Sequence, residues 1–372
     1  MDFAYSEDQQ AIGDLARQIL SDKASHERVS EIEKSGGDRF DSELWRALGE
    51  AGLVGIAVPE EFGGGGLGFL ELALIIEQIG RRAAPIPFLE STVMAGLPLN
   101  EFGSDAQKAA WLPKLASGAA ILTAALVEGE ADPERPTTLA RPDGDGFRLT
   151  GTKLCVPAGQ LADCILLSAS TGEGAASVFL VDPRSEGVSL TPLITTSGQP
   201  EARLKLDDVA VGVADVLGDP RGGRAIIEWI MERTNAALCS LAAGVCDEAL
   251  SITAEYTKTR KQFDVPIASF QAVGQRAADA YIDAEAVRLT ALQAAWRISE
   301  GLPAANATAA AKVWAAEGGQ RVVHTAQHLH GGVGVDRDYP VHRYFLYAKQ
   351  LELTLGGGTR QLLKLGAMLA AE

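Results

Sequence analysis

The C-terminal third of the chain holds most of the residues whose types and spacing could do chemistry. Arg260, Gln262 and Phe263 lie just before Pro266, where a predicted long helix ends. An arginine there can bind a phosphate while the aromatic ring packs on a planar ligand. It can equally cap the helix C-terminus through the helix dipole. The residues alone leave both interpretations open.

Histidines and glycines form a second cluster. His328 and His330 are two residues apart, so they point to different sides of a helix, which argues against a joint metal site. His330 precedes Gly331–Gly332, a pair that is also typical of a simple helix stop. The four cysteines show no CxxC spacing. Neither a metal site nor a disulfide scaffold is expected.

Two glycine-rich segments could suggest a phosphate loop. Gly63–Gly66 has no GxxxxGK[ST] motif and no surrounding βαβ unit, which favours a surface turn. GGGT at 356–359 lies in a helical pattern, where each glycine costs about 1 kcal/mol relative to alanine. That cost indicates close approach of the backbone to a neighbouring helix or to a ligand.

Composition excludes several classes of function. The 372 residues carry 33 basic and 49 acidic side chains, a net charge of −16, which argues against nucleic-acid or membrane-surface binding. With 47% hydrophobic and 22% charged residues, disordered and fibrous classes are excluded. No uninterrupted apolar run approaches the roughly 20 residues that span a bilayer. The start, MDFAYSEDQQ, is acidic where a signal peptide is basic, so a cytoplasmic protein is expected.

The elements that must position these residues follow from hydrophobic periodicity. Over the first hundred-odd residues the spacing is helical, and Ser6 followed by Gln9 predicts a capping box. From about 121 to 217 the segments are short and rich in Val, Ile, Leu and Thr, with a hairpin-type DGDG at 143–146. This stretch predicts a small antiparallel β domain.

After Arg221 the helical period returns and holds almost to the end. The long helical runs lie at 226–259, 268–300, 303–330 and 341–370. Four long helices with short connections predict a four-helix bundle. We therefore expect an α+β protein with an N-terminal helical domain (1–118), a middle antiparallel β domain (119–218) and a C-terminal four-helix bundle (219–372).

Several segments together resemble the acyl-CoA dehydrogenase family over essentially the whole length. The matching stretches are GLVGIAVPEEFGGGGLG (52–68), GSDAQKAAWLPKLASG (103–118), GFRLTGTK (146–153), TRKQFDVPIASFQAVGQRAADAY (259–281) and HLHGGVGVDRDYPVHRY (328–344). The fold of this family has the same helical, β, helical order.

The resemblance implies a β-oxidation type of chemistry. In the family a glutamate carboxylate removes a proton from the carbon α to a CoA thioester, while FAD accepts hydride from the β carbon. The thioester oxygen is hydrogen-bonded as charge develops. The FAD lies at a subunit interface, so each site draws on two chains. An electron-transfer flavoprotein-type acceptor is implied.

The half-site given to a neighbour's FAD resembles the family pattern. Arg260 matches the arginine at the pyrophosphate, and Gln262, Phe263 and Gln271 match residues on the adenosine-ribose side. Gly331–Gly332 matches the glycines that let the cofactor approach.

Two further matches in this half-site are weaker. His328 stands where many relatives carry glutamine, and Phe270 departs from some of them.

The half-site for the chain's own flavin departs from the family. Where the family has Trp-Ile-Thr-Asn-Gly, this chain has 155–159, CVPAG. Pro157 offers flavin N5 neither a hydroxyl nor an amide N–H, and Cys155 cannot replace an aromatic ring. The stretch resembling TEPxAGSD is degenerate at 127–132.

The catalytic base is also missing from its two family positions. These positions correspond to Gly357 and Thr234, and neither residue can act as a carboxylate base. Glu232 lies two residues from Thr234, which on a helix is about 200° of rotation away from the site. Glu232 is therefore a weak candidate.

This pattern resembles the base-less subunit of heteromeric actinobacterial acyl-CoA dehydrogenases, including those acting on steroid side-chain CoA thioesters. A heterotetramer with a homologous catalytic subunit is implied. The alternatives are a self-sufficient homotetramer that uses Glu232 or another carboxylate, and a flavin-free structural or CoA-binding homologue. An oxidase-like activity on the same fold would still need a carboxylate base.

Overall fold

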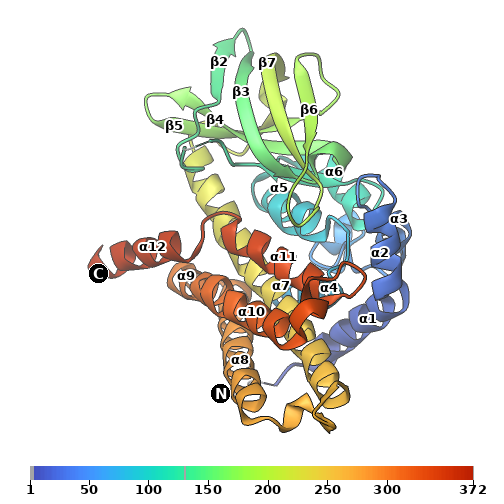
Figure 1. Ribbon diagram of the computed structural model, residues 1–372. Helices are drawn as coiled ribbons and strands as arrows, with labels where there is room; N and C mark the ends of the chain where they lie inside the picture. Colours follow the sequence, from blue (N-terminus) through green and yellow to red (C-terminus); the bar gives the residue numbers. More distant parts are fainter. Residues whose placement is uncertain (1–3, 130, 372) are drawn as a thin grey trace. The chain divides into compact units, whose positions relative to one another are not determined.

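The computed structural model describes residues 4–129 and 131–371 (Figure 1). The chain forms two compact units. We call Met1–Lys34, Phe69–Ala84 and Asn235–Glu372 the helical unit, and Ser35–Gly68 with Pro85–Thr234 the sheet unit. Helix α7 (Gly223–Thr259) begins in the sheet unit and continues into the helical unit.

The helical unit contains three helices from the N-terminal part of the chain, α1 (Glu7–Lys23), α2 (His26–Lys34) and α4 (Phe69–Arg82). The predicted capping box is confirmed, because Ser6 and Gln9 exchange hydrogen bonds of 3.1 and 3.0 Å at the start of α1. Helix α4 meets α7 at a pair of glycines. A Cβ on Gly80 would lie 2.2 Å from the Leu241 carbonyl oxygen, so the two backbones are in direct contact.

The rest of the helical unit is built from the C-terminal part of the chain. After α7 come α8 (Gln271–Ser299), α9 (Ala305–Val313), the π-helix η6 (Trp314–Gly318), α10 (Gly319–His330), α11 (Val341–Leu353) and α12 (Gly358–Ala371). The predicted run at 303–330 corresponds to α9, η6 and α10 in unbroken succession. Buried alanines on α8 allow these helices to pack closely. The C-terminal helical bundle is thus as expected.

The predicted helical run at 341–370 is wrong in its middle, because the helix stops between α11 and α12. Leu355 and Gly356 have φ of 53° and 101°, which no α-helix accommodates. The fully buried Lys312 donates to the carbonyls of Leu351 and Glu352 and so satisfies the last turn of α11. Burial lowers the pKa of Lys312 to about 8.

The sheet unit combines short helices with one sheet. Its helices include α3 (Ser42–Glu50), the 3₁₀ turn η1 (Glu60–Phe62), the π-helix η2 (Glu90–Gly96), α5 (Leu97–Phe102) and α6 (Asp105–Ala116). Its strands are β1 (Leu122–Ala125), β2 (Leu139–Asp143), β3 (Gly146–Pro157), β4 (Cys164–Gly172), β5 (Ala175–Val181), β6 (Val188–Leu193), β7 (Glu201–Gly212) and β8 (Val216–Leu217). The strand order is β6-β7-β3-β2-β4-β5-β8, and β1 also pairs with β4.

The expectation of a purely antiparallel middle domain is wrong in one respect, because the sheet is mixed. Strand β1 runs parallel to β4, with Leu122 opposite Cys164, and β2 meets β4 in parallel through Leu139 and Ser170. Parallel pairing requires a long connection, and residues 126–163 provide one between β1 and β4. The predicted hairpin is confirmed, since Asp143 pairs with Gly146 between β2 and β3.

Helix α7 is long and apolar enough to cross a membrane by length and composition alone. However, 72% of its most apolar window is buried, which is typical of a core helix.

Candidate functional site

A tight hairpin presents the predicted ligand-facing residues at the end of α7. Strands β9 (Lys261–Gln262) and β10 (Val265–Pro266) pair antiparallel, and the turn residues Phe263 and Asp264 have φ of 52° and 65°. Two positive φ values at the centre of a two-residue loop describe a type I′ turn, which normally prefers Asn-Gly. The turn therefore carries backbone strain, and it leaves Phe263 89% exposed.

A ring contact and backbone hydrogen bonds from the flanking residues hold this hairpin in position. The Phe263 and Phe270 rings meet edge to face at 6.3 Å, and Phe270 immediately precedes α8. The Arg260 carbonyl accepts a 2.9 Å bond from Ile267 N–H. The Gln262 amide donates to the Lys261 carbonyl at 2.8 Å.

An aromatic stack joins this hairpin to the glycines after α10. The buried His330 ring stacks on Tyr256 at 4.3 Å, and its Nδ1 is 2.7 Å from the Ala326 carbonyl. The Tyr256 carbonyl also accepts from Arg260 N–H at 2.8 Å. Arg260 and Gly331 are thereby held in one region. Sequence reasoning missed Tyr256 as a positioning residue, although its aromatic type one turn before Arg260 was a usable signal.

The two glycines leave open space beside this region. Gly331 has φ 60° and ψ −135°, a conformation reserved for glycine. A Cβ added to Gly331 or Gly332 would meet none of the described atoms within 4 Å. The glycines thus leave room for another molecule to approach the backbone.

The donor set of this half-site fits FAD. Within the described ranges, the exposed Arg260 side chain has no hydrogen-bond or ion-pair partner, so its guanidinium is available to a diphosphate. Phe263 offers an exposed ring to a planar group. Together with the open glycines, these groups are the chemistry that the resemblance implies for binding the FAD of a neighbouring chain.

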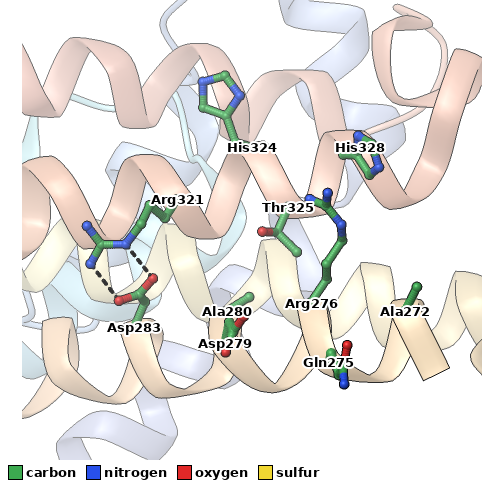
Figure 2. Close-up of a pocket in the computed structure, with 10 residues that line it drawn as sticks. All are labelled: Ala272, Gln275, Arg276, Asp279, Ala280, Asp283, Arg321, His324, Thr325 and His328. Carbon is green, nitrogen blue, oxygen red and sulfur yellow. Dashed lines mark hydrogen bonds and ion pairs between the residues drawn. The ribbon is translucent and has the colours of Figure 1, made fainter.

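His328 lies near one end of a groove between α8 and α10 (Figure 2). The groove is lined by Ala272, Gln275, Arg276, Asp279, Ala280, Asp283, Arg321, His324, Thr325 and His328, and has a volume of about 620 Å³. Gln271 directly precedes Ala272 on α8. Toward the other end, Arg321 binds Asp283 through two hydrogen bonds of 2.8 and 2.6 Å.

The half-site that the resemblance assigns to the chain's own flavin lies at the end of β3, and it lacks the available donors of the half-site around Arg260. Cys155 has φ 49° at a bulge in the β3–β7 pairing. The Pro157 carbonyl accepts a 2.6 Å bond from the Thr123 hydroxyl, and Pro157 has no N–H to donate. Partial burial and the nearby Glu201 carboxylate raise the pKa of Cys155 to about 11, so its thiol stays protonated at neutral pH. These groups do not fit flavin N5.

The degenerate stretch at 127–132 has a structural role that sequence reasoning missed. Glu130 lies outside the described residues. Glu128 is buried and accepts from Lys153 Nζ at 2.5 Å, and from the backbone N–H groups of Thr137 and Thr138 at 2.6 and 3.1 Å. The fully buried Lys153 also donates to Ser168 at 3.0 Å.

The charges of this buried pair are complementary at neutral pH. Burial alone would raise the pKa of Glu128, but the Lys153 charge and the hydrogen bonds hold it at about 2. Burial lowers the pKa of Lys153 to about 8. The pair therefore ties β3 to the segment after β1.

Comparison with known proteins shows the family of the chain. Residues 6–119 match the acyl-CoA dehydrogenase N-terminal domain and residues 221–368 match the C-terminal domain. The acyl-CoA dehydrogenase FadE27 of Mycobacterium tuberculosis is 44% identical over 100% of this chain and 99% of its own length. The chain belongs to the acyl-CoA dehydrogenase family.

Solved structures of this family have the same fold. The ChsE4–ChsE5 complex from Mycobacterium tuberculosis contains a chain 44% identical with a TM-score of 0.94, covering 100% of both chains. The butyryl-CoA dehydrogenase of Megasphaera elsdenii has 26% identity and a TM-score of 0.91, again over 100% of both chains. The family is one of FAD-binding oxidoreductases.

Neither of the two positions that the resemblance assigns to the catalytic base, Gly357 and Thr234, carries a carboxylate. Gly357 lies between α11 and α12, and a Cβ there would meet, of the described atoms, only the Glu352 carbonyl at 3.5 Å. Space therefore does not forbid a side chain at this position. The loop is held from the other side by Gln361, whose amide donates to the Leu355 and Gly356 carbonyls at 3.3 Å.

The second position is fully buried. Thr234 has no hydrogen-bond partner for its hydroxyl in the described part of the chain. Glu232 lies 3.6 Å from Arg233, whose guanidinium lies 3.6 Å over the Trp229 ring. Glu232 thus forms an ion pair with Arg233.

In residues 4–129 and 131–371, no group of three or more His, Cys, Asp or Glu side chains is placed to hold a metal ion.

Proposed function

We propose that this chain is a subunit of a heteromeric FAD-dependent acyl-CoA dehydrogenase, in which it completes the FAD site of a homologous catalytic chain. The observation that carries this proposal is the asymmetry between the two half-sites. The groups for a neighbour's FAD, Arg260, Phe263 and Gly331–Gly332, are exposed and available. The groups for the chain's own flavin are replaced at Cys155 and Pro157.

The roles of this chain's residues follow from their chemistry. When bound, FAD would accept hydride from the β carbon of a CoA thioester. Arg260 would hold the diphosphate by charge-assisted hydrogen bonds, and Phe263 would pack on a planar part of the cofactor. With glycine at 357 and threonine at 234, the α-proton would be removed by a carboxylate of the partner chain.

The relatives support the heteromer and suggest the substrate class. Two of the similar structures are complexes of two proteins, ChsE4 with ChsE5, and the steroid ACAD of Tcur3481 with Tcur3483 at 42% identity, TM-score 0.91 and 98% coverage of both chains. We infer a bulky, steroid-type acyl-CoA as substrate, an electron-transfer flavoprotein-type acceptor, a heterotetramer, and a cytoplasmic location.

Substitution of Arg260 and Glu232 separates this proposal from its rivals. In the co-expressed assembly, Arg260→Gln should lower the bound flavin, because the diphosphate loses its charged partner. Glu232→Gln should leave bleaching of the flavin by acyl-CoA unchanged. Abolished bleaching in Glu232→Gln would favour a self-sufficient homotetramer. Unchanged flavin content in Arg260→Gln would contradict the role of Arg260 in the FAD site, and a wild-type assembly without bound flavin would favour a flavin-free CoA-binding homologue.

A further inference from the structure

The corner between α1 and α2 places a histidine among positive charges. His26 is the first residue of α2, and its ring meets the Tyr344 ring edge to face, with the two centroids 6.2 Å apart. Tyr344 and its neighbour Arg343, both on α11, are buried. Arg82, the last residue of α4, is the second guanidinium that opposes a positive charge on the His26 ring. All of these helices belong to the helical unit.

Ion pairs with other carboxylates hold the two arginines in place. Arg343 binds both oxygens of Glu33 at 2.7 and 3.0 Å. Arg82 lies 3.6 Å from the Glu248 carboxylate on α7 and donates to the Ser21 hydroxyl on α1 at 2.9 Å. Breaking either ion pair would leave a partly buried carboxylate without its partner, so the guanidiniums stay beside the histidine.

The His26 ring has no acceptor that would neutralise a charge on it. Its Nδ1 atom is buried and makes no hydrogen bond within the part of the chain that the structure describes. The carboxylate that favours a charged ring is that of Glu27, which is exposed to water. The Tyr344 hydroxyl donates to the Arg81 carbonyl at 2.7 Å. A protonated His26 would therefore add a third positive charge beside two arginines.

Protonation of His26 is thus linked to the packing of α2. Burial, and then the charges of Arg343 and Arg82, lower the pKa of His26 below its ordinary value of 6.5. A ring that has left the corner for water regains the ordinary pKa. The neutral ring therefore stabilises the packed corner above about pH 6.5, and this contribution is lost as the pH falls below that value.

We propose that His26 is an acid-sensitive latch that holds α2 against α11. When the imidazole ring takes up a proton from water, repulsion by the two arginines moves it out of the corner, and α2 loosens. Glu33 and Lys34, at the end of α2, bind Arg343 and Asp338 at 2.7 and 3.0 Å. Residues 336–343 therefore loosen together with α2.

The loosened segment reaches the aromatic stack beside the glycines. Tyr339 lies in this segment, and its ring is 5.1 Å from the His330 ring and 6.1 Å from the Tyr256 ring. Acid would therefore loosen contacts far along the sequence from His26. This link gives the latch a second region in which its opening can be measured.

Hydrogen–deuterium exchange of the full chain, followed by mass spectrometry, tests the latch. Protection factors, which correct for the effect of pH on the intrinsic exchange rate, are compared at about pH 7.5 and about pH 5.5. Peptides that cover α2 and residues 336–344 should lose protection several-fold at the lower pH. His26→Phe should keep its protection at both pH values, because phenylalanine keeps a ring beside Tyr344 and takes up no proton.

His324→Phe is the matched control, because it removes an exposed histidine from α10 in the same unit. It should lose protection at the lower pH as the wild type does. His26→Gln is the second variant, and it keeps the test open if phenylalanine disturbs the corner. Glutamine takes up no proton either, so this variant should also keep its protection at the lower pH.

Two outcomes would overturn the inference. An equal loss of protection in the wild type and in both His26 variants would assign the acid effect to other groups. Unchanged protection of α2 in the wild type at the lower pH would mean that His26 takes up its proton without moving the helix. Neither outcome bears on the proposed function, because the measurement needs no FAD and no turnover.

Discussion

Gly357 occupies one of the two positions that the resemblance assigns to the catalytic base. Its φ lies outside the left-handed region, and a Cβ would make only an ordinary contact with the Glu352 carbonyl at 3.5 Å among the described atoms. We expect Gly357→Glu to fold with nearly the wild-type unfolding temperature. If the proposed function holds, it should nevertheless fail to oxidise acyl-CoA when purified alone, because Cys155 and Pro157 would not hold a flavin in the same chain. Scanning fluorimetry and flavin bleaching check both points.

Gly357→Ala serves as the control for the added side chain. Turnover by the glutamate variant alone would mean that the chain's own flavin half-site is functional.

The buried Glu128–Lys153 pair makes a separate prediction about stability. Removing one partner of such a pair costs about 3–5 kcal/mol, since the other charge is left uncompensated. Glu128→Gln should therefore destabilise the sheet unit strongly in urea unfolding, and Glu173→Gln, an exposed glutamate in the same unit, should not.

The contribution of the Glu128 carboxylate to the free energy of unfolding depends on pH in a direction that its pKa predicts. The pKa of Glu128 is about 2 in the folded chain against an ordinary value of 4.5, so its contribution is present above about pH 4.5. It is lost as the pH falls from 4.5 toward 2. The stability gap between wild type and Glu128→Gln should narrow over this interval. A gap independent of pH would contradict the ion pair.

At the scale of elements, the β9–β10 hairpin combines strain with an exposed ring. Phe263→Gly relieves the positive φ but removes the ring, whereas Asp264→Gly relieves strain and keeps the ring. We expect FAD affinity of the assembly to fall several-fold in the first variant and to stay unchanged in the second. Equal losses in both would assign the effect to hairpin rigidity rather than to stacking.

Hydrophobic periodicity predicted much of the secondary structure, because the pattern of apolar residues within most helices and strands shows which of their residues are buried. The capping box at Ser6, the hairpin at 143–146 and the C-terminal helical bundle are all confirmed. The break between α11 and α12 was not predicted. It depends on Lys312, which reaches the end of α11 from a distant part of the sequence.

Non-local pairing explains the other differences. The parallel contact of β1 with β4 and the bond between Glu128 and Lys153 join segments that no local pattern connects. The residues predicted to contact FAD stay a prediction. The structure adds that the Tyr256–His330 stack holds Arg260 near Gly331, a relation that spacing alone does not contain.

At the scale of the whole molecule, the proposed function rests on a difference between the two FAD half-sites that the resemblance assigns to one chain. An acyl-CoA dehydrogenase that forms its FAD site from two chains can divide the work between unequal subunits, each keeping one half. Under the proposed function, such a chain needs neither a catalytic base nor a flavin-facing strand of its own. The part that it must keep is the surface that contacts the partner chain.

The flavin-to-chain ratio tests this division of labour most directly. The chain is purified alone and after co-expression with a homologous acyl-CoA dehydrogenase chain that carries the catalytic glutamate, and the visible spectrum is measured in both samples. We expect little flavin in the chain alone and about one FAD per pair of chains in the assembly. One FAD per chain in the sample purified alone, bleached by an acyl-CoA, would contradict the proposed function.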